Sequence, residues 1–150
     1  MALRDGLMEE IKDAMRAKAA ERLSALRLIL NGLKEREIAL RGEGAAMSAA
    51  DELTVLAKMV KQRQESVKMY LEGLRQDLAD KEAAEIKVIE EFLPNQLSVA
   101  EVEAAIGAAV AEVGAASVKD MGKVMAVLKA KFTGQMDFGA VGALIKARLG

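Results

Sequence analysis

One stretch of the sequence contains the signals of a complete helix. It begins with Ser117-Val118-Lys119-Asp120-Met121-Gly122-Lys123-Val124-Met125 and runs to Gly134. Ser117, followed by an acidic residue three positions later, is typical of a helix N-cap, and Gly134 supplies a stop. At about 100° per residue, one side of this expected helix is apolar. Its members are Met121, Val124, Met125, Leu128 and Phe132. We therefore predict one capped helix that packs this side into a core.

The opposite side of the same helix is smooth and basic. Gly122, Ala126 and Ala130 form a strip of small residues spaced by four, and Lys119 and Lys123 stand beside it, one turn apart. Such a surface suits close approach by a phosphate backbone or by another helix. The plainer interpretation, which the charge pattern alone favours, is an ordinary solvated face.

Apolar spacing and helix-end signals predict four helices before this region. One apolar stripe begins at Leu3, and a second begins at Leu23 after a tight corner near Lys18. One long bent helix is the alternative, because the corner contains neither Gly nor Pro. Ser48 caps a third helix, and Pro94 ends a fourth.

Within the third helix, the polar run 61–66 interrupts the apolar stripe. It is either an exposed stretch or a contact point that uses Arg63. Several of the nine methionines fall in apolar stripes, so we expect them to pack in cores. These are Met8, Met15, Met59, Met121 and Met125.

The C-terminal part is predicted to hold three short helices. Ser98 and Asp137 cap the first and the last of them, on either side of the stretch that begins at Ser117. No segment shows the alternation of a β-strand. The fold class is therefore all-α, with an N-terminal domain over 1–94 and a C-terminal domain over 98–150.

Composition excludes several kinds of chemistry. Without histidine or cysteine, the chain cannot build a Ser-His or Cys-His nucleophile pair or an ordinary zinc site. No glycine-rich phosphate loop is present either, so we expect no catalytic residue, no cofactor and no metal. No long apolar run suggests a membrane span or a secretory signal, and a cytoplasmic location is predicted.

Charge is unevenly distributed along the chain. The net charge is −1, but residues 115–150 carry six Lys or Arg against Asp120 and Asp137, which gives +4. The remainder holds 16 basic and 21 acidic residues, which gives −5. A mildly basic C-terminal part can select an anionic partner for one end of the molecule.

Five short strings, in order along nearly the whole chain, resemble the YqeY family. They are Glu21-Arg22-Leu23-Ser24-Ala25-Leu26-Arg27, Lys61-Gln62-Arg63 to Ser66, Arg75-Gln76-Asp77-Leu78, Phe92-Leu93-Pro94 with Gln96-Leu97, and Met121-Gly122-Lys123-Val124-Met125. The second half is also similar to the C-terminal tail of GatB, a subunit of the aspartyl/glutamyl-tRNA amidotransferase. The resemblance implies two helical subdomains and a link to tRNA-dependent amidation, in which that tail helps to hold tRNA. After Gly134 the chain departs from the family pattern, which commonly has Arg-Ala-Asp-Gly there.

Three functions follow from these observations. The first is a non-catalytic accessory module that binds tRNA, with Lys119, Gly122, Lys123, Lys129 and Lys146 as contacts. The second is a protein-interaction module, for example for an amidotransferase subunit, that receives a partner helix on the small-residue strip. The third is a carbon-nitrogen ligase with glutamine as amido donor, which rests on the family label alone.

Overall fold

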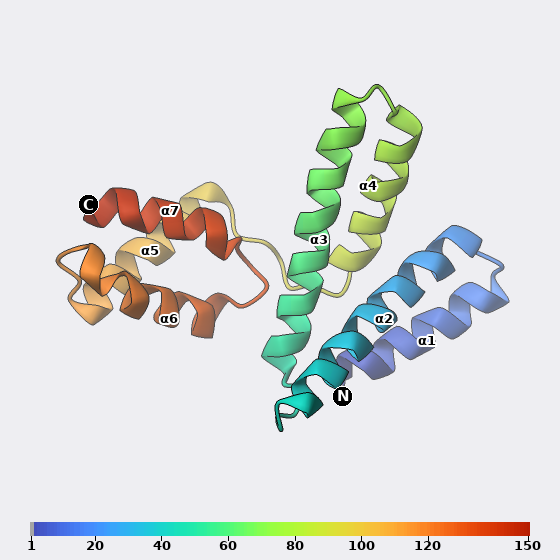
Figure 1. Cartoon of the computed structure of the whole chain (residues 1–150), viewed down its shortest axis with the longest axis horizontal. Helices are drawn as coiled ribbons and strands as arrows, with labels where there is room; N and C mark the ends of the chain where they lie inside the picture. Colours follow the sequence, from blue (N-terminus) through green and yellow to red (C-terminus); the bar gives the residue numbers. More distant parts are fainter. Residues whose placement is uncertain (1) are drawn as a thin grey trace. The chain divides into compact units, whose positions relative to one another are not determined.

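The computed structural model describes residues 2–150, which form seven α-helices and one 3₁₀ turn (Figure 1). No strand occurs in this part of the chain, so the all-α prediction is confirmed. The chain divides into two compact units, one that ends at Leu93 and one that comprises Pro94–Gly150. Each unit has its own apolar core. Independent folding of the two units remains a prediction.

The first unit is built from two helical hairpins. Its helices are α1 (Ala2–Arg16), α2 (Ala20–Gly42), α3 (Ala49–Glu72) and α4 (Gln76–Glu90). Helix α1 packs on α2, α3 packs along α4, and α2 also packs against both α3 and α4. The centre of the core is fully buried and consists of Leu7, Leu26, Ile29, Leu33, Leu56 and Ile89.

The second unit is a small three-helix arrangement. It contains α5 (Val99–Val113), the 3₁₀ turn η1 (Val118–Asp120), α6 (Met121–Phe132) and α7 (Phe138–Leu149). Helix α6 packs against both α5 and α7, and its apolar side supplies the fully buried Val124 and Leu128. The predicted inward side of this helix is therefore correct.

The predicted caps are formed, with one difference in what they cap. Ser48 and Ser98 each make a reciprocal capping box, and the Asp137 carboxylate accepts from the first amides of α7. Ser117 also makes a capping box, but it caps η1, and α6 begins only at Met121. The carboxylate of Asp120 holds amides just before it, which tightens this first turn into the 3₁₀ form.

Helix α4 ends earlier than predicted. Its last residue is Glu90, and the amides of the next three residues bond to carbonyls only three positions back. Pro94 disfavours helical geometry at the residue before it, so the chain leaves the helix through a tightened turn.

Two helix ends place a non-glycine residue in the left-handed region. Lys18 has φ 55° and Leu74 has φ 58°, whereas Gly114 takes the same role after α5 with φ 65°. At Leu74 the amide of Arg75 donates to the Tyr70 carbonyl at 2.8 Å, the long bond of a Schellman motif. The predicted corner at Lys18 has the same pattern, so α1 and α2 are two helices.

Replacing Leu74 by glycine should therefore stabilise the protein. The left-handed conformation costs a non-glycine residue about 1–2 kcal/mol. Glycine avoids this cost, but its greater conformational entropy in the unfolded state offsets part of the gain. Leu74 is 91% exposed, so its removal sacrifices almost no burial. We expect a gain of about 0.5–1 kcal/mol in chemical denaturation. Gly114→Ala, the opposite change, should cost about 1 kcal/mol; equal stability of all three proteins would contradict the argument.

The methionines only partly follow the predicted core pattern. Met59 packs against the first core, and Met121 and Met125 pack against the second. Met8 and Met15 are 40% and 54% exposed, so core packing was the wrong prediction for these two. Helix α1 packs substantially on α2 alone, which buries a narrower face than the apolar stripe spans. Met69, near the end of α3, is 70% exposed.

Candidate functional site

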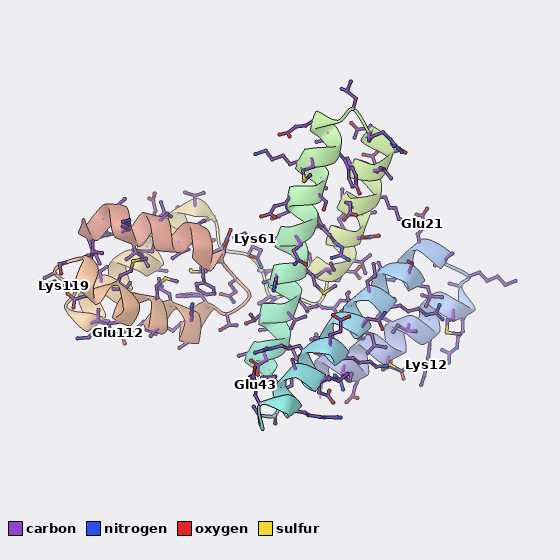
Figure 2. The ribbon with its side chains drawn as sticks, in the orientation of Figure 1. Lys12, Glu21, Glu43, Lys61, Glu112 and Lys119 are labelled. Carbon is purple, nitrogen blue, oxygen red and sulfur yellow. The ribbon has the colours of Figure 1, made fainter. Side chains whose placement is uncertain are left out.

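The start of α6 is held by a small hydrogen-bond network. The Asp120 carboxylate accepts from the backbone amides of Ala116 and Ser117 at 3.0 and 3.4 Å, and the Lys119 amide donates to the Ser117 hydroxyl at 3.3 Å. These bonds fix the backbone of η1. The Lys119 side chain, labelled in Figure 2, is exposed beside it, and Lys123 is exposed as well.

The same network adds one negative charge to this surface. Amide donation from Ala116 and then Ser117 lowers the pKa of Asp120, and the charge of Lys123 acts in the same direction. Asp120 is therefore ionised at neutral pH. It offsets part of the positive potential that the two lysines create.

The strip of small residues on α6 is open to solvent. Gly122, Ala126 and Ala130 are exposed, and a Cβ atom added at Gly122 would meet nothing within 4 Å. A ligand backbone could approach this face closely because no side chain covers it.

The other two predicted contacts lie apart from this start. Lys129 belongs to the last turn of α6, about 9 Å along the axis from Lys123. Lys146 lies in the last turn of α7, which packs against η1. The fold thus brings Lys119, Gly122 and Lys123 together, places Lys146 at the same end of the unit, and leaves Lys129 at the other end of α6.

None of the four predicted lysines forms an ion pair with a described residue. The neighbouring Lys131, which was not predicted, instead binds the Glu112 carboxylate of α5 at 3.0 Å. A ligand can therefore bind these lysines without breaking an ion pair, although at Lys123 it competes with the nearby charge of Asp120.

A second feature, which the sequence did not reveal, is a groove of about 770 Å³ between α2 and α4. We call it the α2–α4 groove. Its lining includes small or short side chains, which we call the floor: Ala20, Ser24 and Ala25 from α2, and Ala84 and Val88 from α4. Its volume is in the range of ligand-binding clefts. Two of the strings that carry the family resemblance, 21–27 and 75–78, contribute lining residues.

The charged lining residues of the α2–α4 groove, which we call its rim, are mainly acidic. Glu21 lies on the α2 side, while Asp77, Asp80 and Glu85 lie on the α4 side with Lys81 between them. Arg22 also lines the groove, but its guanidinium is already paired with carboxylates outside the groove lining. Its guanidinium donates to both oxygens of the Glu91 carboxylate at 2.7 and 3.0 Å and to Glu10 at 2.9 Å.

The polar run in α3 has an internal role. Arg63 is largely buried and binds Glu85 of α4 at 3.1 Å, with Glu82 at 4.0 Å. Of the two interpretations of the run, neither describes Arg63, because its guanidinium joins α3 to α4 within the unit. Lys61, in contrast, is exposed.

No group of three His, Cys, Asp or Glu side chains converges as a metal site among residues 2–150. Within the same range, no helix combines the length and the apolar character required to cross a membrane.

A comparison against known families finds a match over nearly the whole chain. The pattern of the family described as Yqey-like protein matches residues 4–149. The chain therefore belongs to the YqeY family. The comparison does not test the similarity to the GatB tail.

The chain is similar to fungal proteins named "Altered inheritance of mitochondria protein 41, mitochondrial". The protein of Lachancea thermotolerans is 36% identical over 94 residues, which cover 63% of this chain and 49% of the relative. The protein of Vanderwaltozyma polyspora is 35% identical over 59% of this chain and 46% of the relative. A Saccharomyces cerevisiae protein is 34% identical over 58% and 46%. The matches thus span about half the length of these relatives.

The names of these relatives contradict the predicted cytoplasmic location. They are mitochondrial proteins, so this comparison points to mitochondria and the prediction was wrong. A chain without cysteine and without a long apolar run is compatible with either compartment, so these features could not separate the two.

Proposed function

We propose that this YqeY-family protein is a non-catalytic accessory module that binds tRNA in connection with tRNA-dependent amidation. The observation that carries the proposal is the surface at the start of α6. There Lys119 and Lys123 are exposed and unpaired beside the open backbone of Gly122. Lys146 extends the positive charge from α7, and Lys129 extends it along α6.

The chemistry of this surface favours phosphate over bases. The whole chain has four aromatic residues, one Tyr and three Phe, and the Phe residues at 132 and 138 pack against the second core. Little aromatic surface is left for stacking on single-stranded bases. The module would therefore recognise the shape and the backbone of an RNA duplex.

A charge reversal tests this proposal. Lys119→Glu together with Lys123→Glu should weaken binding to bulk tRNA by about tenfold at low salt, and should flatten the dependence of affinity on salt because fewer counterions are released. Helix content and melting should change little, since surface substitutions seldom exceed about 0.5 kcal/mol. Fluorescence anisotropy across a salt series measures both quantities.

The matched control reverses two exposed lysines of the first unit, Lys34→Glu with Lys87→Glu. The control changes the net charge by the same amount. If it lost tRNA binding equally, the loss would be due to the overall charge of the protein and not to the surface at the start of α6. Unchanged binding in the Lys119 and Lys123 variant would contradict the proposal.

A second function is favoured by the open strip itself. A partner helix could pack on Gly122, Ala126 and Ala130, because small residues allow close approach of two backbones. Ala126→Leu adds bulk there while keeping every charge and good helix propensity. If Ala126→Leu abolished binding to a protein partner while the Lys119 and Lys123 variant still bound tRNA, the partner-helix function would replace the tRNA proposal.

A further inference from the structure

The α2–α4 groove keeps an excess of negative charge after the ion pairs within the protein are counted. Of its carboxylates, Asp77 is bound by Arg75 at 3.0 Å and Glu85 by Arg63 at 3.1 Å. Glu21 has no such partner, and Asp80 accepts only a neutral amide hydrogen bond at 2.7 Å, from Gln76. Glu21 belongs to α2 and Asp80 to α4. Lys81, which also lines the groove, forms no ion pair with a described residue and offsets one of these two charges.

This arrangement selects the kind of ligand. The acidic rim repels phosphate, so the groove is unsuited to RNA. Its carboxylates do not converge into a group of three that could hold a metal ion. Negative charge spread along two walls is instead complementary to a ligand whose positive charges are also spread out.

The floor of the groove narrows the choice further. Its members are Ala20, Ser24 and Ala25 on α2 and Ala84 and Val88 on α4, and none of these side chains is long. Short side chains permit a third helix to approach two others at the usual packing distance of about 8–10 Å. In helix-in-groove binding an amphipathic helix lays its apolar face into an apolar groove, and the small, mostly apolar floor fits that mode.

We propose that the α2–α4 groove is a docking site for a basic amphipathic helix of a protein partner. Its lysine or arginine side chains bind Glu21 and Asp80, and its small or apolar face lies on the alanine floor. The site is separate from the lysine surface of α6. It is independent of whether that surface binds tRNA, because none of the four lysines contributes to the groove.

The probe is an acetylated and amidated helical peptide with lysines spaced among alanines, compared with the same peptide carrying glutamate instead. The lysine peptide should bind the full chain at low ionic strength. In NMR spectra, the backbone amides whose chemical shifts change on binding should lie in α2 and α4. Glu21→Lys with Asp80→Lys should weaken binding by about tenfold or more. The matched control, Glu35→Lys with Glu65→Lys, changes exposed residues outside the groove and should have a much smaller effect.

A steric variant separates a helix from a small cation. Ala84→Trp fills the groove without changing its charge and should abolish peptide binding, while Ala39→Trp, exposed on α2 outside the groove, should not. Spermine and Mg²⁺ are titrated in parallel. Equal losses in the two charge-reversal variants would overturn the proposal in favour of non-specific attraction. Binding of spermine or Mg²⁺ at Glu21 and Asp80 without peptide binding would overturn it in favour of a small-cation site.

Discussion

Leu128→Ala is expected to unfold the second unit under conditions in which the first unit stays folded. Leu128 is fully buried at the centre of the second core, where α6 packs against its neighbours. Truncating a buried leucine to alanine costs about 2–5 kcal/mol, because it removes apolar contacts and leaves a cavity. A unit as small as Pro94–Gly150 is stabilised by only about 3–9 kcal/mol in total. Most of that stability would be lost.

Limited proteolysis combined with thermal denaturation measures this effect. The variant should yield a resistant fragment that ends near Leu93, and one of two thermal transitions should move to low temperature. The matched variant Leu26→Ala, fully buried in the first core, should move the other transition. If both variants shifted one common transition, the two units would fold as a single cooperative body and the proposed division into domains would be wrong.

Glu52→Met should raise the free energy of unfolding by about 1–3 kcal/mol at neutral pH. Glu52, in the first turn of α3, is only 3% exposed, and its Oε2 atom has no hydrogen-bond partner among the described residues. A buried carboxylate without full pairing destabilises the folded state, whereas methionine fills a similar volume without charge. Glu35→Met, at an exposed position of α2, is the control and should have little effect.

The gain from Glu52→Met should depend on pH in a defined direction. Burial raises the pKa of Glu52, although Arg4 acts in the opposite direction. Because the pKa of Glu52 is higher in the folded state than in the unfolded state, the folded protein favours the protonated carboxyl. Glu52 therefore does not destabilise the fold at low pH, and it becomes destabilising as pH rises through its folded-state pKa. The difference between variant and wild type should therefore shrink as pH falls. A difference that stayed constant would show that the charge of Glu52 is not the cause.

The sequence predicted local structure well where one residue type determines it. Serine capping boxes form at 48, 98 and 117, because the serine and the acidic residue three positions later need only each other, although the box at Ser117 caps η1 and not α6. The inward side of α6 follows from helical spacing alone. The exposure of Lys123 follows from the same spacing, whereas Lys119 is exposed on η1, before α6 begins. The role of both lysines as contacts remains a proposal.

What the sequence could not predict depends on how distant helices cross. The α2–α4 groove joins residues such as Ser24 and Ala84 that are far apart in the chain, and its floor of small residues carries no distinctive local pattern. The pairing of Arg63 with Glu85 likewise requires the α3–α4 hairpin. The left-handed residue after α3 is Leu74, although the adjacent Gly73 is the residue that helix-end statistics favour.

The distribution of the methionines has a consequence for oxidative damage. Met15 and Met69 are more than half exposed, so conversion of their thioethers to sulfoxides would add an oxygen that water already solvates. Met47 and Met136 are buried, and the same oxygen there would enter an apolar core. Oxidants in solvent therefore reach the thioethers of Met15 and Met69 first, where oxidation disturbs no apolar core. With no thiol in the chain, no mixed disulfide can form, and reductases that act on methionine sulfoxide can reverse the surface reaction.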